Sequence, residues 1–178
     1  MEAIVSNVNE IQVLNLPLER DLFLRNLIRH LSGTLQDVIG VEEASGFISI
    51  VGQQVGDEIN GEYRKALNVT HIDKSLIGAV LVDLKRRIGG DFYIVSEDDE
   101  KIVLGNRQCP FEDKVLGRPA MCMMTSNVFG TITAENLGYS QVELTETIAN
   151  GAAQCRVVVH LQPNDTDAPR PGIEYYRV

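Results

Sequence analysis

The sequence lacks most of the features that mark specialised protein classes. It has no tryptophan, only three cysteines, and no run of about 18 apolar residues that would cross a bilayer. Its first residues carry neither a basic leader nor a small-residue cleavage site, so we expect a cytoplasmic protein with no membrane partner. An odd cysteine count in such a chain argues against a disulfide framework and leaves free thiols, metal ligation or a redox switch.

Common catalytic motifs are absent as well. There is no Gly-x-Ser-x-Gly, no phosphate-binding glycine loop and no His-x-x-x-His pair. We therefore favour a protein that is not an enzyme, although a small hydrolase or reductase acting through Cys109 or Cys122 remains an alternative. With 16 Lys and Arg against 25 Asp and Glu, the net charge of −9 opposes direct binding to nucleic acid.

Hydrophobic periodicity predicts a single α/β (α+β) domain. Apolar residues at three- and four-residue steps favour helices over residues 18–39, 42–67, 74–88 and 121–137. Alternating runs favour antiparallel strands over residues 92–96, 101–104, 139–148 and 155–161. The expected architecture is N-terminal helices packed on a mainly antiparallel sheet, with one helix between two hairpins. Residues 1–17 would form an arm, 18–161 the domain and 162–178 a Pro- and Asp-rich tail.

Two charged runs are expected to be solvated. The acidic residues 97–100 lack the alternating ligands and central glycine of a calcium loop, so they predict the turn of a hairpin. Lys85, Arg86 and Arg87 close the third helix, where basic side chains suit the helix dipole. We expect these three to lie in a solvated last turn.

The helix over residues 42–67 contains an unusual number of glycines, each of which costs about 1 kcal/mol relative to alanine. Gly52 and Gly56 are spaced so that another backbone or a ligand can come close. Tight helix packing is one explanation, and a ligand pocket with Met123 and Met124 as an adaptable apolar wall is the other.

The three cysteines are the strongest candidates for a shared site. Cys109 precedes the fourth helix, Cys122 lies in its first turn and Cys155 begins the last strand, so the thiols could converge on zinc or an iron–sulfur cluster. The helix dipole would lower the pKa of Cys122. A redox switch without metal is one alternative, and cysteines that merely pack around an organic-ligand pocket or in the core are the other.

Three thiols would leave a fourth ligand position open. The candidates for it are His71, Glu146, His160 or an exogenous molecule. The alternation of the last strand favours a solvent-facing His160. Heme would need an axial histidine over a large cavity. Since only His71 is placed for that role, we do not expect heme.

The C-terminal part of the sequence resembles a known family. A hairpin, a Cys-Pro pair, a helix and the pattern Glu-x-x-x-x-Gly-x-x-x-Cys, formed by Glu146, Gly151 and Cys155, are similar to the 4-vinyl-reductase-like and methanogen output domains. The resemblance covers roughly residues 42–161 and is clearest over residues 101–161. That family commonly has a cysteine directly after the glutamate, whereas this chain has Thr147. The departure removes one thiol from any metal site inferred by analogy.

The resemblance implies a fold shared with heme-nitric-oxide-binding domains and transport-protein-particle subunits. It also implies a ligand- or metal-responsive signalling module, of a kind often fused to a kinase or a transcription regulator. We therefore predict a stand-alone sensor domain that binds a metal or a small ligand at the three cysteines. The long apolar face of the first helix predicts a homodimer.

Overall fold

The computed structural model describes residues 12–16, 18–164 and 168–177 and confirms the α+β class. The helices are α2 (Arg20–Ile39), α3 (Val41–Leu67), α4 (Lys74–Arg87) and α5 (Met123–Leu137). The strands are β1 (Phe92–Glu97), β2 (Lys101–Asn106), β3 (Tyr139–Glu146), β4 (Cys155–His160) and β5 (Ile173–Tyr176). Short 3₁₀ turns are η1 (Glu112–Val115), η2 (Pro119–Cys122) and η3 (Ile148–Asn150). Most of the predicted arm lies outside the described residues, and residues 12–16 contain no strand.

The predicted helices are confirmed within a few residues at each end. Asp73 caps α4 by accepting a hydrogen bond from the Ser75 N–H at 2.9 Å. Gly40, at φ +89°, ends α2 and turns the chain directly into α3. Gly138, at φ +97°, closes α5, and a side chain would be strained in that backbone conformation. Short polar caps and glycines therefore set the limits of these helices.

One antiparallel sheet has the strand order β1-β2-β4-β3-β5. The chain between β2 and β3 includes α5, so these two strands are not neighbours in the sheet, and β4 lies between them. Val157 of β4 pairs with Leu104 of β2 on one side and with Leu144 of β3 on the other. The structure corrects one expectation. Part of the segment assigned to a tail is β5, which pairs with β3 from Tyr139↔Tyr176 to Val142↔Ile173.

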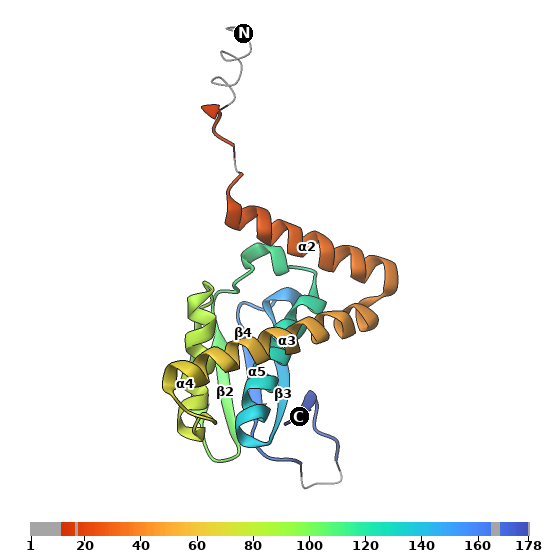
Figure 1. Ribbon diagram of the computed structural model, residues 1–178. Helices are drawn as coiled ribbons and strands as arrows, with labels where there is room; N and C mark the ends of the chain where they lie inside the picture. Colours follow the sequence, from red (N-terminus) through yellow and green to blue (C-terminus); the bar gives the residue numbers. More distant parts are fainter. Residues whose placement is uncertain (1–11, 17, 165–167, 178) are drawn as a thin grey trace, which may run out of the picture.

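The helices are layered on the sheet (Figure 1). In this view α2 lies outermost, and α3 passes back beneath it across α5. On the sheet, α5 contacts β3 and β5. The main core forms where α4, α5 and the sheet meet. Phe129 is its largest fully buried side chain and contacts Phe92 edge to face at 5.4 Å. No helix in the described part of the chain is both long enough and apolar enough to cross a lipid bilayer.

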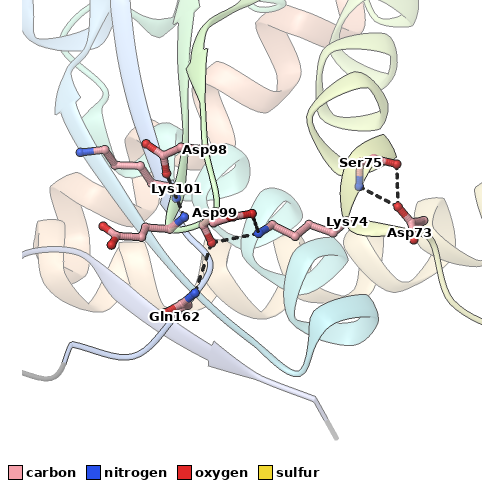
Figure 2. Close-up of polar contacts among 8 residues, drawn as sticks. Asp73, Lys74, Ser75, Asp98, Asp99, Lys101 and Gln162 are labelled. Carbon is pink, nitrogen blue, oxygen red and sulfur yellow. Dashed lines mark hydrogen bonds and ion pairs between the residues drawn. The ribbon is translucent and has the colours of Figure 1, made fainter.

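The acidic residues between β1 and β2 form an exposed turn, as predicted. Asp98 Oδ1 accepts hydrogen bonds from the N–H groups of Glu100 and Lys101 at 2.8 and 2.9 Å (Figure 2). Lys74, at the start of α4, reaches Asp99 Oδ1 at 2.7 Å, and Gln162 donates to the Asp99 carbonyl at 3.3 Å. The carboxylates thus hold the hairpin tip and attach it to α4.

The glycines of α3 fall into two groups according to what faces them. A Cβ on Gly56 would lie 2.9 Å from Thr131 Cβ and 3.3 Å from Val128 Cα, and one on Gly52 would lie 2.8 Å from Asn127 Cβ. These two glycines allow α3 to touch α5. Gly61 has nothing within 4 Å of its Cβ position.

This contrast predicts opposite effects of the same substitution. Gly61→Ala is expected to raise the free energy of unfolding by about 0.5–1 kcal/mol, since alanine is the better helix former. Gly56→Ala is expected to lower it by about 1–3 kcal/mol, because the helices must move apart. Urea unfolding of both variants measures the difference. Equal stabilisation by the two would show that α3 and α5 are not in close contact.

Candidate functional site

The three cysteines line one partly enclosed cavity of about 60 Å³, which we call the thiol chamber. Its wall is mainly apolar. Apart from the cysteines, its polar side chains are those of Lys85, Asn106, Thr125 and Thr147. The lining residues are Lys85, Ile88, Phe92, Asn106, Cys109, Pro110, Phe111, Val115, Met121, Cys122, Met124, Thr125, Leu144, Thr147, Ile148, Ala149, Cys155 and Val157. The sequence-based grouping of the thiols therefore corresponds to a real hollow in the fold.

Each thiol arrives from a different element. Cys109 lies in the loop after β2, Cys122 ends η2, and Cys155 begins β4. Cys155 Sγ accepts weak hydrogen bonds from Ile148 N–H at 3.4 Å and from Asn106 Nδ2 at 3.8 Å. Thr147, which stands where the resembled family commonly has a cysteine, lines the same chamber.

Burial sets the protonation of two of these thiols. It raises the pKa of Cys122 to about 12 and also raises the pKa of Cys109. The predicted lowering of the Cys122 pKa is therefore wrong. A helix dipole contributes typically about 0.3–1 kcal/mol, less than one pKa unit, and desolvation exceeds it here. Both groups are neutral thiols at pH 7, which weakens the alternative of a cysteine nucleophile.

The predicted fourth ligands do not line the chamber. His71 is exposed before α4, next to Ile72, whose N–H donates to Asn136 near the end of α5. A helix of 15 residues places that end about 22 Å from Cys122. His160 lies at the other end of β4 from Cys155, about 16 Å away at the usual rise of a strand.

Two of these candidates have other surroundings. Glu146 is exposed at the end of β3. His160 was expected to face solvent, but only 15% of its side chain is exposed, and its Nε2 lies 3.7 Å from Glu143 Oε2. Burial lowers the pKa of His160. Across the described residues, no group of three or more His, Cys, Asp or Glu is placed to hold a metal ion.

The predicted pocket residues separate in space. Gly52 and Gly56 face α5, as described above, and Met123 lies outside the chamber lining. Met124 lines both the thiol chamber and a second hollow of about 320 Å³. We call this second hollow the helix groove. Its lining is almost entirely apolar and consists of Ile28, Leu31, Ser32, Leu35, Ile48, Val51, Phe111, Met121 and Met124.

Three side chains belong to both hollows, namely Phe111, Met121 and Met124. They form the partition between the thiol chamber and the helix groove. Methionine is unbranched and adapts readily to a new neighbour, so two of the three are suited to move. A shift of this partition would join the two hollows into one apolar passage.

Lys85 is the main residue of the site that sequence reasoning missed. It was expected in a solvated last turn, yet its exposed fraction is 3%, whereas Arg86 and Arg87 are exposed. Its Nζ donates to Thr125 Oγ1 at 2.9 Å and lies over the rings of Phe92 and Phe129. The signal was its position four residues after Leu81, on the buried face of α4.

The environment of Lys85 disfavours its charge. Burial lowers the pKa of Lys85 to about 8, and the three thiols act on it in the opposite direction. No carboxylate among the described residues forms an ion pair with it. The chamber therefore combines two neutral thiols with one buried amine.

The segment that covers the chamber, residues 109–122, is attached to α2 by three arginines. Arg25 forms an ion pair with Glu112, and Arg29 donates to the carbonyls of Lys114 and Leu116. From the segment itself, Arg118 reaches Asp37 at 3.2 Å. We call these contacts the arginine latch. The cover of the chamber and the outermost helix are thus joined directly.

Solved structures with this fold include the following two. One is the phenol-responsive sensory domain of the transcription activator PoxR with phenol, at a TM-score of 0.59 and 17% identity over 83% of this chain and 77% of that one. The other is a trafficking protein particle complex subunit 3 from Naegleria fowleri covalently bound to palmitic acid. Its TM-score is 0.54 and its identity 12%, over 79% of this chain and 96% of that one. None of the curated proteins matches the sequence.

The fold is therefore one that is shared by a sensory domain and a trafficking subunit. The sequence itself is matched by the family of methanogen output domain 1 over residues 27–160. This chain belongs to that family, and the suspected relationship is confirmed. The matched region runs from the middle of α2 to the last residue of β4 and contains the whole thiol chamber.

Proposed function

We propose that this domain is a sensor that holds a small organic molecule in the thiol chamber. The observation that carries the proposal is the chamber itself, a hollow with an apolar wall and a few polar groups beneath a segment tied to α2. Membership of an output-domain family and the fold shared with a phenol-responsive sensory domain both support it.

The size of the chamber limits what enters without rearrangement. An engineered cavity of about 150 Å³ in another protein binds benzene, whereas this chamber measures about 60 Å³. A ligand of more than a few atoms therefore requires the partition of Phe111, Met121 and Met124 to move toward the helix groove. Such a movement would pull on the segment that the arginine latch connects to α2, which supplies a route from binding to output.

Calorimetry with phenol and benzyl alcohol tests the proposal. We expect at least one of these neutral probes to bind stoichiometrically to the wild-type protein, and we expect Ala149→Met, which fills the chamber, to abolish binding. Ala66→Met, the same change at an exposed position of α3, is the control and should bind normally. Binding that survives Ala149→Met in a folded protein would contradict the proposal, and so would the absence of binding by these probes and by the acids and amides described below.

A zinc or iron–sulfur site at Cys109, Cys122 and Cys155 is the second candidate, and what favours it is that the three thiols share one chamber. Elemental analysis and the visible spectrum of anaerobically purified protein decide between the two. Stoichiometric metal that is lost in Cys109→Ser would move the assignment to a metal sensor. The predicted homodimer is likewise a proposal, and a monomeric mass by light scattering at micromolar concentration would contradict it.

A further inference from the structure

The amine of Lys85 is incompletely bonded. An ammonium group has three donors, and among the described residues only Thr125 Oγ1 accepts from it. The side chain is 3% exposed, so bulk solvent does not reach it freely. Lys85 is also one of the residues that line the thiol chamber.

The charge of Lys85 is also incompletely balanced. The rings of Phe92 and Phe129 lie 5.7 and 5.2 Å from Nζ and offer only partial negative charge. No carboxylate among the described residues forms a salt bridge with the amine. Buried charges in proteins are normally paired, so the chamber lacks an anion.

Thr125 adds a second donor at the same place. Because its hydroxyl oxygen accepts from Lys85, its own hydrogen remains available for a ligand atom. A carboxylate has two oxygens, and it could accept from Lys85 Nζ with one and from the Thr125 hydroxyl with the other. Lys85 is the one cationic side chain in the lining, so a second negative charge would find no partner.

We infer that the ligand of the thiol chamber is an organic monocarboxylate, whose head pairs with Lys85 and Thr125. This rests on the proposed function and narrows it to a ligand class. The apolar remainder of the acid lies against the partition of Phe111, Met121 and Met124. Acids with longer chains extend past that partition into the helix groove, whose lining is almost entirely apolar.

Matched pairs of acid and amide test the inference by calorimetry on the full chain at pH 7. The probes are hexanoate against hexanamide and benzoate against benzamide, which differ in charge but hardly in size. In the wild-type protein the acid is expected to bind at least about tenfold more tightly, as a charged hydrogen bond gives. Adipate, a dicarboxylate with a chain similar to that of hexanoate, is expected to bind more weakly than hexanoate.

Two variants test whether Lys85 and Thr125 cause the preference for acid over amide. Lys85→Met should remove the preference for acid while the amides still bind, and Thr125→Val should reduce it. Lys65→Met, at an exposed position of α3, should leave it unchanged. Circular dichroism verifies that each variant is folded, and if Lys85→Met does not fold, Thr125→Val and the wild-type comparison still decide.

The failures are distinguishable. Equal binding of acid and amide by the wild-type protein would overturn the inference and leave the proposed function standing. If Lys85→Met still preferred the acid to the amide, the inference would also be overturned, because a residue other than Lys85 would then recognise the carboxylate. If neither acids nor amides bind, and the neutral probes above do not bind either, the proposed function fails with the inference.

Discussion

Phe129→Ala is expected to lower the free energy of unfolding by about 3–5 kcal/mol. The side chain is 0% exposed at the centre of the main core, where α5 meets the sheet. Its removal would leave a cavity beside Phe92, whose ring it contacts at an interplanar angle of 76°. Small domains are stable by about 5–15 kcal/mol, so this one change would remove a large part of the stability. Urea unfolding, monitored by circular dichroism, measures the loss.

Phe129→Leu is the matched control for this experiment. Leucine keeps most of the volume but has no ring to face Lys85, so the expected loss is about 1–1.5 kcal/mol. A loss from Phe129→Ala no larger than that from Phe129→Leu would show that the site collapses around the missing ring. The core would then be less tightly packed than the structure indicates.

Lys85→Met is expected to raise the free energy of unfolding at pH 7 by about 2–3 kcal/mol. Burial lowers the pKa of Lys85 from 10.5 to about 8, so below pH 8 the folded protein is destabilised by a charged amine in an apolar chamber. Methionine has a similar shape and no charge. The lost hydrogen bond to Thr125 offsets the gain by about 1 kcal/mol.

The advantage of Lys85→Met is expected to shrink as the pH rises from about 8 to about 10.5. In that window the unfolded wild-type protein still binds the proton while the folded protein has lost it, so wild-type stability increases with pH. The buried thiols of Cys109 and Cys122, whose pKa values are raised, act in the opposite sense. Their burial is common to both proteins, so the difference in unfolding free energy reports the titration of Lys85 together with its interaction with these thiols.

Chemical denaturation at pH 7, 8, 9 and 10 provides this comparison. Lys65→Met is the control, and a change at that exposed position of α3 is expected to stay within about 0.5 kcal/mol at each pH. A constant advantage of Lys85→Met across the series would show that the buried amine titrates as it does in water. That outcome would contradict the enclosed environment described here.

Much of the fold could be predicted because its elements carry local signals. Asp73 and Gly138 mark helix ends, and the apolar periodicity marks the helices between them. The strand β5 carries no such signal, since its flanks contain Pro169, Pro171 and Gly172 and its partner lies some thirty residues earlier. What secures β5 is tertiary: the ring of Tyr175 occupies the space above Gly130 on α5.

The sequence allowed us to predict that the three cysteines lie together, but it did not allow us to predict the buried amine of Lys85 beside them. Local structure placed Cys109, Cys122 and Cys155 near one another, and they do share a chamber. The burial of Lys85 depends on Phe92, Phe129 and Thr125 packing around it from three other positions in the chain, and no sequence window contains that arrangement. The same burial, not helix position, determines the pKa of Cys122.

The arginine latch couples ligand binding in the thiol chamber to the arrangement of α2, and this coupling acts in both directions. Residues 109–122 are at once a wall of the chamber and the surface on which Arg25 and Arg29 rest. A ligand that favours one arrangement of this segment must favour the matching arrangement of α2 by the same coupling free energy. The converse also holds: a partner that binds the exposed apolar side chains of α2, such as Phe23 and Leu24, and prefers one arrangement of that helix must change the affinity of the chamber by an equal factor.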